Sequence, residues 1–434
     1  MAERFEAVVV GAGPAGSAAA LQLARAGRAV ALVERGPYPG SKNMFGGVVY
    51  ARVLDTLIPG WWEEAPVERW VTRRATVVMT PTQSLTVDFR TVDWGEPPYN
   101  GATAFRADFD RWLADQAVAA GAELICSTTV TGLERDSSGR VHGVRTDRPD
   151  GDIEASVVIA CDGVNSFLAK EAGLYPERDA HFFTLGAKEV LALPRAEIDA
   201  RFGLRDRQGA DFEIIGCTGD IPGGGFLYTN CDSVAVGVVL QLPGLARSGR
   251  RPEDVIAGLK AHPSIAPLVD GGELKEYSAH LIPEGGWEMM PAMVGDGILV
   301  AGDAAALCLA AGIWLEGVNF AIGSGAAAGE TAAEALAAGD TRAPALARYR
   351  RRLEESFVLA DHRRLRRAPA LVLSDRVQSR YPDLACNLVQ SLFTVENPAP
   401  KPGLRRLLRQ QASRSGVGLR HLALDGWRAL RTFG

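Results

Sequence analysis

The sequence predicts an α/β protein in which a nucleotide-binding domain with a parallel sheet is interrupted by an antiparallel β-sheet domain and followed by a helical region. Three observations predict this. A strand, a glycine turn, a helix and a second strand follow one another in residues 5–35. Alternating apolar strands separated by proline and glycine turns fill residues 175–288, and helical, increasingly basic sequence follows residue 344. The 434 residues are enough for more than one packed unit.

These changes of pattern set the expected domain boundaries. The nucleotide-binding domain is discontinuous and comprises residues 1–174 and 289–343. The inserted substrate domain comprises residues 175–288, and the C-terminal region comprises residues 344–434. When one domain interrupts another, a cleft commonly forms between them, and clefts hold substrates.

The first segment, FEAVVVGAGPAGSAAALQLARAGRAVALVER at residues 5–35, predicts a dinucleotide site. Gly11 allows the sharp turn, Gly13 lets the backbone approach a pyrophosphate, and Gly16 lets the helix pack closely on the strand. The unpaired N–H groups at the start of the helix then face the phosphates. Glu34 ends the second strand, where a carboxylate can accept hydrogen bonds from a ribose diol.

The other elements of this domain are read from periodicity and turn residues. We expect a helix at residues 105–121, a strand at 122–130, a hairpin at 132–153 with its turn at 136–139, strands at 155–166 and 296–302, and a helix at 317–336. Asp162 and Asp303 each follow an apolar strand. A buried carboxylate without a partner is unfavourable, so Asp162 should hold one. For Asp162 the candidates are the backbone of the following turn and a bound cofactor.

Composition excludes several classes of function. The chain has 47 Lys and Arg against 52 Asp and Glu, a net charge of −5, so it has no general attraction for nucleic acid. The six cysteines contain no CxxC pair, so neither a metal nor an iron–sulfur site is expected. The sequence shows neither a signal-peptide pattern nor an apolar run of about 18 to 20 residues, so the expected location is the cytoplasm.

Residues 401–434 are far more basic than the chain as a whole. Residues 401–434 contain eight Lys or Arg and a single acid, Asp425. The apolar residues that alternate with the arginines are Leu404, Leu407, Leu408, Leu419, Leu422, Leu430 and Phe433. This pattern is typical of an amphipathic helix lying on a membrane surface, and equally of a docking surface for a partner subunit.

The glycine loop with its distal glutamate, the strand ending in Asp162-Gly163 and the strand ending in Gly302-Asp303 together resemble the FAD-binding oxidoreductases of the p-hydroxybenzoate hydroxylase type. The resemblance implies FAD as the cofactor. It implies that Asp303 holds the ribityl and pyrophosphate part of FAD and that the helix beginning near Gly317 directs its positive end at the flavin. It also places Val130 near the adenine and Arg106 against FAD, although Arg106 could instead form an ion pair at the start of its helix.

The expected cofactor-binding residues are Gly11, Gly13, Ala15, Gly16, Glu34, Arg35, Arg106, Val130, Asp162, Gly163, Gly302, Asp303, Gly317, Val318 and Asn319.

Four longer stretches of the sequence narrow the resemblance to one particular family. SKNMFGGVVYARVLDTLIPGWWEEAPVER (41–69), GGGFLYTNCDSVAVGVV (223–239), LKEYSAHLIPEGG (274–286) and YPDLACNLVQSLFTVENPAPKPG (381–403) are similar to the electron-transfer-flavoprotein:quinone oxidoreductase family, in its shorter FixC-type branch. This implies electron transfer from the α and β subunits of an electron-transfer flavoprotein, through FAD, to a membrane quinone, with the protein peripherally attached to the cytoplasmic membrane.

Two positions depart from the larger members of that family. Their C-terminal region carries clustered cysteines that hold a four-iron cluster, whereas Cys386 is the only cysteine here beyond Cys308. The resemblance therefore implies a separate ferredoxin-like iron–sulfur subunit as a partner. Glu316 stands where close relatives often carry a basic residue, so the details of the flavin environment do not carry over from the family.

The resemblance also implies a substrate site. Gly223 and Gly224 correspond to backbone beside the quinone ring, although by themselves they predict only a β-bulge. Phe226 and Tyr228 would wall the same pocket, or would belong to the core of the sheet.

No residue forms an obvious catalytic acid, base or nucleophile. Tyr277 and His280 are candidates for a proton relay, with a structural role as the alternative. Because flavin carries the electrons, this lack agrees with flavin chemistry. Two alternative functions stay open: a geranylgeranyl-reductase-like flavoenzyme, and a flavin-bearing scaffold subunit without turnover of its own.

Overall fold

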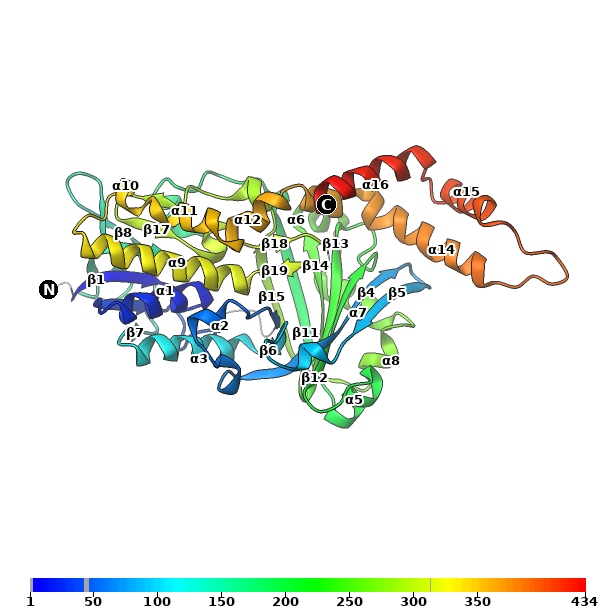
Figure 1. Ribbon diagram of the computed structural model, residues 1–434, viewed down its shortest axis with the longest axis horizontal. Coiled ribbons are helices and arrows are strands. Elements are labelled where there is room, and N and C mark those ends of the chain that lie inside the picture. Colours follow the sequence, from blue (N-terminus) through cyan, green and yellow to red (C-terminus); the bar gives the residue numbers. More distant parts are fainter. Residues whose placement is uncertain (1–2, 43–46, 313) are drawn as a thin grey trace.

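The computed structural model describes residues 3–42, 47–312 and 314–434, and it contains two large sheets and a projecting helical region (Figure 1). The first sheet has the order β16-β17-β10-β1-β2-β7, with β9 and β8 added beside β10. Its strands are β16 (Val294–Gly295), β17 (Ile298–Val300), β10 (Ile153–Ala160), β1 (Glu3–Val10), β2 (Val30–Val33), β7 (Glu123–Ile125), β9 (Val141–Thr146) and β8 (Val130–Arg135). The pairings β17–β10–β1–β2–β7 are all parallel, as the sequence predicts.

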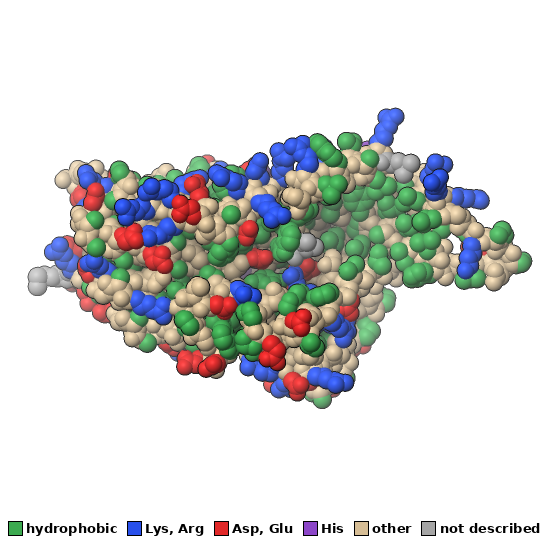
Figure 2. Space-filling view, in the orientation of Figure 1, with side chains coloured by type: hydrophobic (Ala, Val, Ile, Leu, Met, Phe, Trp, Pro, Cys, Tyr) green, Lys and Arg blue, Asp and Glu red, His purple; other side chains and the backbone are tan. Residues whose placement is uncertain are grey.

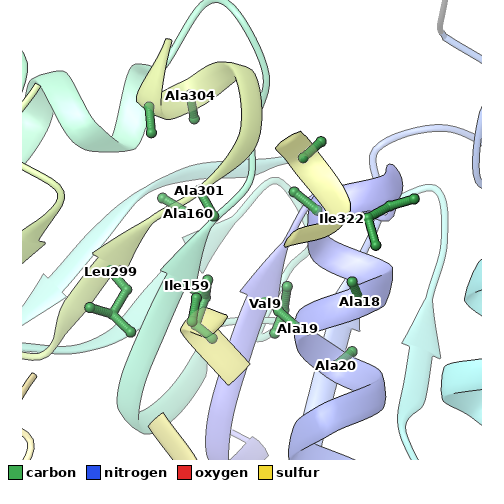
Figure 3. Packing of buried hydrophobic residues seen from close by; sticks show 14 of the residues in the cluster. Val9, Ala18, Ala19, Ala20, Ile159, Ala160, Leu299, Ala301, Ala304 and Ile322 are labelled. Atoms are coloured by element: carbon green, nitrogen blue, oxygen red, sulfur yellow. The ribbon is translucent and has the colours of Figure 1, made fainter. Parts of the chain in front are cut away.

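Helix α1 (Pro14–Arg25) and helix α9 (Val318–Ala337) pack closely over this sheet (Figure 1). A Cβ atom added at Gly325 of α9 would lie 2.0 Å from the carbonyl oxygen of Ala15 in α1, so only glycine permits this approach. Further along the contact, Gly329 of α9 meets the backbone of Ala19 in α1, and Ala18, Ala19 and Ala20 are all fully buried (Figure 3). Helix α3 (Arg106–Ala119), expected from the sequence at residues 105–121, buries Phe109, Leu113 and Ala117.

The second sheet has the order β15-β11-β14-β13-β12-β4-β6-β3, with β5 beside β4. Its strands are β15 (Glu273–Pro283), β11 (Phe183–Ala192), β14 (Ser233–Gln241), β13 (Gly223–Thr229), β12 (Gln208–Ile215), β4 (Val67–Met79), β6 (Ala102–Ala104), β3 (Gly47–Val49) and β5 (Ser84–Arg90). All pairings are antiparallel except β4 with β12, which is parallel. Strands β3 to β6 come from residues assigned by sequence to the nucleotide-binding domain, so the chain enters the second sheet earlier than residue 175.

The two sides of the second sheet differ in polarity. Phe212 and Ile214 of β12, Leu227 of β13 and Val236 of β14 belong to an apolar core on one side. Helices α5 (Arg195–Phe202), α7 (Pro252–Ala261) and α8 (Ala266–Val269) contribute Ile198, Val255 and Val269 to that core. Because successive side chains of a strand alternate between faces, the neighbouring residues Asp211 and Glu213 lie on the opposite side.

The C-terminal region forms helices that extend beyond the two sheets (Figure 1). They are α10 (Ala343–Leu346), α11 (Arg348–Glu355), α12 (Phe357–Arg364), α13 (Ala368–Val372), a π-helical turn η6 (Arg376–Arg380), α14 (Tyr381–Phe393), α15 (Leu404–Arg414) and α16 (Leu419–Phe433). Asp425 of α16 accepts hydrogen bonds from Arg376 (2.5 and 2.9 Å) and from the Tyr381 hydroxyl (2.6 Å), which fastens the last helix to the region before it. Among the described residues, no helix is both long enough and apolar enough to cross a bilayer.

Candidate functional site

The ends of four parallel strands bring the predicted cofactor residues to one edge of the first sheet. Val10 of β1 is in register with Val33 of β2 and Ala160 of β10, and Ala160 is in register with Val300 of β17. Gly11, Glu34, Asp162 and Asp303 follow these strand ends within one to three residues. The carboxyl edge of a parallel sheet is where open α/β folds bind their ligands.

The glycine loop, residues 11–16, is shaped by close backbone contacts. Gly11 has a φ of 98°, and a Cβ atom there would lie 2.3 Å from the carbonyl oxygen of Cys161. A Cβ atom at Gly16 would lie 1.8 Å from the carbonyl oxygen of Gly11. At Gly13, by contrast, it would meet no atom of the described residues within 4 Å. Gly11 and Gly16 are therefore required by the fold, whereas Gly13 borders the open space at the start of α1 that a phosphate group needs.

Glu34 holds the glycine loop in place. Its carboxylate accepts hydrogen bonds from the backbone N–H groups of Ala12 (3.0 Å) and Gly36 (2.7 Å). Glu34 is buried and the next residue, Arg35, is exposed. The expected ribose contact would add to this structural role, because each carboxylate oxygen can accept more than one hydrogen bond.

Asp162 makes the backbone contact that the sequence offered as one of its two roles, and the cofactor contact stays a prediction. One carboxylate oxygen accepts a hydrogen bond from the N–H of Leu168 (3.0 Å), so the side chain caps the turn before α4 (Phe167–Glu171). The other oxygen is buried without a hydrogen-bond partner among the described residues. Burial raises the pKa of this carboxyl group. Beside it, Gly163 has a φ of 76° and borders open space.

Asp303 lies with Arg106 and His280 where the two sheets meet. The pKa of Asp303 is raised by burial, and Arg106 and His280 oppose that effect. Arg106 forms a two-bond ion pair with Asp110 (2.7 and 2.8 Å), which is the helix ion pair considered as the alternative to an FAD contact. Burial lowers the pKa of His280. This group joins the carboxyl edge of the first sheet, through Asp303, to β15 of the second.

The start of α9 supplies a further place for the cofactor. Of the atoms that the structure describes, a Cβ atom at Gly317 would come near only the Cys308 sulfur, at 3.9 Å, so the described residues leave the space before the helix open. Val318 is the first residue of α9 and is half-buried. Asn319 is buried; its side-chain nitrogen donates to Glu316, and its Oδ1 has no partner within the described residues. The positive end of the helix dipole points at this space.

The remaining predicted cofactor residues lie near these groups in sequence or in space. Ala15 is in the first turn of α1 and packs beside Gly302, where an added Cβ atom would be 2.9 Å from the Ala15 Cβ. The N–H of Gly302 donates to the Ser324 hydroxyl (3.0 Å) of α9. Val130 is the half-buried first residue of β8, paired with Thr146. Its expected contact with adenine stays a prediction.

The second sheet presents a set of polar and aromatic residues that we call the polar side. Strand register places on this side Arg74 of β4, Asp211 and Glu213 of β12, Phe226 and Tyr228 of β13, Lys188 of β11 and His280 of β15. The electrostatic partners of His280 include Asp303 and Arg106, and those of Glu213 include Glu316, just before α9. The polar side therefore faces the carboxyl edge of the first sheet.

Titration of these groups is strongly affected by burial. Burial and the Asp211 charge raise the pKa of Glu213 to about 8, against the opposing effect of Arg74. Burial also raises the pKa of Asp211 to about 6 and lowers the pKa of Lys188 to about 7. Sequence reasoning did not select Arg74, Lys188, Asp211 or Glu213. The alternation of apolar and acidic residues in β12 indicates two different faces, but it does not tell whether the acidic face meets solvent or a cleft.

The predicted substrate residues are on β13. Phe226 and Tyr228 lie on the polar side with nearly parallel rings (centroids 6.0 Å apart, 14° between planes). The alternative, that both belong to the core of the sheet, fits only Tyr228, which is buried. The Tyr228 hydroxyl is 3.2 Å from Nζ of Lys188. The N–H of Gly223 donates to Oε1 of Gln378 in η6 (3.0 Å), and Gly224 pairs with Val239 in the sheet.

Tyr277 and His280 do not form a proton relay with one another. They are three residues apart on β15, so their side chains lie on opposite sides of the strand. Tyr277 is partly exposed and interacts with Glu253 of α7, whereas His280 faces Asp303.

Comparison with known proteins agrees with this arrangement. Residues 4–199 match the FAD binding domain family, and residues 368–434 match the ETF-QO/FixC family C-terminal domain. The chain is 40% identical over 425 residues to a probable electron transfer flavoprotein-quinone oxidoreductase, YdiS, of Escherichia coli K12, covering 98% of both chains. It is 38% identical over 434 residues to protein FixC of Bradyrhizobium diazoefficiens, covering 98% of this chain and 99% of the relative. The chain belongs to the ETF-QO/FixC family.

Solved structures of lower identity share the fold. A geranylgeranyl bacteriochlorophyll reductase-like protein from Thermoplasma acidophilum superposes with a TM-score of 0.73 at 19% identity, covering 96% of this chain and 98% of the other. The myxobacterial chondrochloren halogenase CndH, an FAD-dependent halogenase, superposes with a TM-score of 0.67 at 16% identity, covering 99% and 97%.

This ETF-QO/FixC family member is an FAD-dependent oxidoreductase, and its residues fit FAD. The open space beside Gly13 and Gly163 and the unpartnered oxygens of Asp162 and Asn319 lie along the carboxyl edge and the start of α9. Together they offer room for phosphate groups and hydrogen-bond acceptors for hydroxyl and N–H groups. The prediction of an FAD-binding α/β fold with an inserted sheet and a helical C-terminal region is confirmed.

Proposed function

We propose that this protein accepts electrons from an electron-transfer flavoprotein, directly or through a ferredoxin-like subunit, and reduces a membrane quinone. The observation that carries the proposal is the 40% identity, over 98% of both chains, to a relative named as a probable electron transfer flavoprotein-quinone oxidoreductase. The match of residues 368–434 to the ETF-QO/FixC C-terminal domain supports it.

The chain's own residues bind and orient the cofactor. The N–H groups at the start of α1 bind the pyrophosphate beside Gly13, and Asp303 binds the ribityl part. Bound FAD supplies the electron-transfer chemistry. The N-terminus of α9, at Gly317, Val318 and Asn319, stabilises negative charge on the ring system through its dipole and N–H groups.

The quinone head group would enter between the start of α9 and the polar side of the second sheet. Phe226 and Tyr228 offer aromatic surface for the ring, and the backbone of Gly223 and Gly224 lies on the same strand. Because the N–H of Gly223 already donates to Gln378, a quinone carbonyl that binds this N–H must replace that side chain.

Membrane contact would come from the projecting helices. Exposed apolar side chains gather on α14, α15 and α16 and the segment between them, together with arginines (Figure 2). They are Leu392, Phe393, Val395, Leu404, Leu424, Trp427 and Leu430, of which Phe393 is 81% and Leu430 is 73% exposed. Of the leucines predicted for this surface, Leu407 is buried instead, and the side chain of Leu419 lies outside what the structure describes.

Apolar residues mixed with arginines suit the interface of an anionic membrane, so we propose peripheral attachment to the cytoplasmic membrane. The alternative is that the same surface binds a partner subunit. A ferredoxin-like subunit remains part of the proposal, since Cys386 is the only cysteine after Cys308 and one cysteine cannot hold a cluster.

The test combines purified components under anaerobic conditions. Reduced electron-transfer flavoprotein, the holoprotein and a water-soluble ubiquinone or menaquinone analogue are mixed with and without the ferredoxin-like subunit, and quinol is measured. Quinol formation that requires this protein supports the proposal. Rapid reoxidation by a prenyl substrate but not by quinone would favour the geranylgeranyl-reductase-like alternative, which rests here on likeness of fold alone. A holoprotein reoxidised by neither would favour the scaffold.

A further inference from the structure

A buried group of ionisable side chains lies on the polar side of the second sheet, apart from the residues assigned to FAD. Arg74 of β4 donates a hydrogen bond to Glu213 of β12, and its Nε lies 3.6 Å from the Asp211 carboxylate. Tyr50, which follows β3, packs its ring 5.4 Å from the Arg74 guanidinium. Glu316, which precedes α9, is within electrostatic range of Arg74, Glu213 and Tyr50. We call these five residues the Arg74 cluster.

The charges of the Arg74 cluster do not balance if every carboxyl group is ionised. Three carboxyl groups, those of Asp211, Glu213 and Glu316, share Arg74 as the cation that acts on each of them among the described residues. Asp211 and Glu213 are both buried. Two net negative charges in a buried group are strongly unfavourable, so the cluster should retain at least one proton at neutral pH.

Glu213 is the carboxyl group best placed to carry that proton. It lies directly opposite Phe226 on β13, and cross-strand partners project from the same face with Cβ atoms about 5 Å apart. Asp211 lies opposite Tyr228 in the same way, one step further along the strand. Glu213 therefore adjoins the aromatic residues proposed for the quinone and also lies within electrostatic range of Glu316, beside the start of α9.

We propose that Glu213, held between Arg74 and Asp211, stores and delivers a proton to the quinone as it is reduced. This inference rests on the proposed function. A quinone that takes up two electrons must also take up two protons, one on each carbonyl oxygen. The electrons come from reduced FAD, whose own protons leave to solvent; the O–H bond of Glu213 breaks as one quinone O–H bond forms, and the second proton enters from solvent. The resulting Glu213 carboxylate is stabilised by Arg74 until it regains a proton from solvent.

The charged groups that face Glu213 shift its pKa in opposite directions. Arg74 favours the carboxylate, whereas Asp211 on the same strand and Glu316 before α9 favour the protonated form. Burial adds to the effect of the two acids, and the resulting pKa of about 8 leaves the group protonated at pH 7. Proton donation should therefore weaken as pH rises through about 8.

The test uses the holoprotein with Glu213→Gln, which keeps the shape of the side chain and removes the proton. Glu189→Gln is the matched control, because Glu189 is also buried in the second sheet but faces the opposite side, where it pairs with Lys260. Reduced holoprotein is mixed anaerobically with a quinone analogue, or with ferricyanide, which takes up an electron without a proton. FAD content is measured for each variant, and Glu213→Asp is added because it restores a carboxyl group.

The expected result is that Glu213→Gln slows the quinone reaction relative to the ferricyanide reaction by about a hundredfold. It should also abolish the decline in the wild-type quinone rate above about pH 8. Glu189→Gln should change neither, and Glu213→Asp should recover part of the rate. Infrared difference spectra should show a protonated carboxyl band at pH 7 that Glu213→Gln removes.

Failure of this inference is distinguishable from failure of the proposed function. A wild type that reduces quinone, with a Glu213→Gln variant of unchanged rate ratio, overturns the inference alone. The absence of a Glu213-dependent carboxyl band also overturns it, whatever the kinetics of the variants. A wild-type holoprotein that is reoxidised by ferricyanide but by no quinone overturns the proposed function and the inference with it.

Discussion

Glu213 accepts a hydrogen bond from Arg74 across two neighbouring strands, on the side of the second sheet that faces the carboxyl edge of the first. Because Asp211 shares the same arginine, the pair is not electrically balanced. A carboxyl group in these surroundings keeps its proton at pH values where an exposed glutamate is ionised. The effect of this arrangement on the protonation of Glu213 can be measured in the folded protein even without turnover.

The stability of the protein should depend on the ionisation of Glu213. Its pKa is about 8 when folded and near 4.5 in an unfolded chain, so the unfolded state loses this proton more readily. The contribution of the protonated Glu213 carboxyl group to the free energy of unfolding is fully present below pH 4.5 and is lost as pH rises through about 8. As pH rises from 6 to 9, the free energy of unfolding of the wild type should therefore fall relative to that of Glu213→Gln. The expected relative change is at least about 1.4 kcal/mol, the equivalent of one pKa unit. Denaturant unfolding of both holoproteins across this range checks the prediction, and parallel curves would contradict it.

Gly13→Glu should abolish FAD retention while the protein still folds. The Cβ atom of the added side chain lies within 4 Å of no atom in the described part of the chain, but the side chain fills the phosphate space and repels the pyrophosphate by its charge. Gly258→Glu is the control, because Gly258 is an exposed residue of α7 with equally open surroundings. Flavin absorbance per protein measures the result. A yellow Gly13→Glu protein with normal flavin stoichiometry would show that the phosphate site is elsewhere.

Gln378→Leu should strengthen quinone binding if the N–H of Gly223 binds a quinone carbonyl. The substitution removes the acceptor that now occupies this N–H. The KM for quinone should fall about fivefold, which corresponds to one neutral hydrogen bond of about 1 kcal/mol. Steady-state kinetics with quinone and with ferricyanide separate this effect from a general change in activity. An unchanged KM for quinone would exclude Gly223 as a ligand.

Phe393→Asp combined with Leu430→Asp should weaken attachment to vesicles that contain anionic lipid. Each apolar side chain contributes about 1.5–3 kcal/mol when it is fully buried, so each loss should lower affinity by about tenfold or more. Val118→Asp, on an exposed position of α3, is the control. Vesicle sedimentation at two salt concentrations measures the affinity. If the double variant binds vesicles as the wild type does, the exposed surface instead serves a partner subunit.

Local features of the sequence predicted the cofactor half of the site. The glycine loop, Glu34, Asp162 and Asp303 are recognisable because each immediately follows a strand, and parallel strands bring their carboxyl ends together. The Arg74 cluster was not predictable in this way. Arg74 lies on β4, Asp211 and Glu213 lie on β12, and Tyr50 and Glu316 lie in other segments, so tertiary structure decides how they meet. The hydrogen bond between Gly223 and Gln378 joins residues 155 positions apart, and no local pattern indicates it. The same reason explains why β3 to β6 were not assigned to the second sheet.

The most direct test of the account is anaerobic stopped-flow reoxidation of the reduced holoprotein by ubiquinone and menaquinone analogues. The account predicts that flavin absorbance returns in a reaction whose rate rises with quinone concentration, with one quinol formed for each FAD oxidised. A reduced protein that stays reduced with every quinone, yet is reoxidised by ferricyanide, would contradict it.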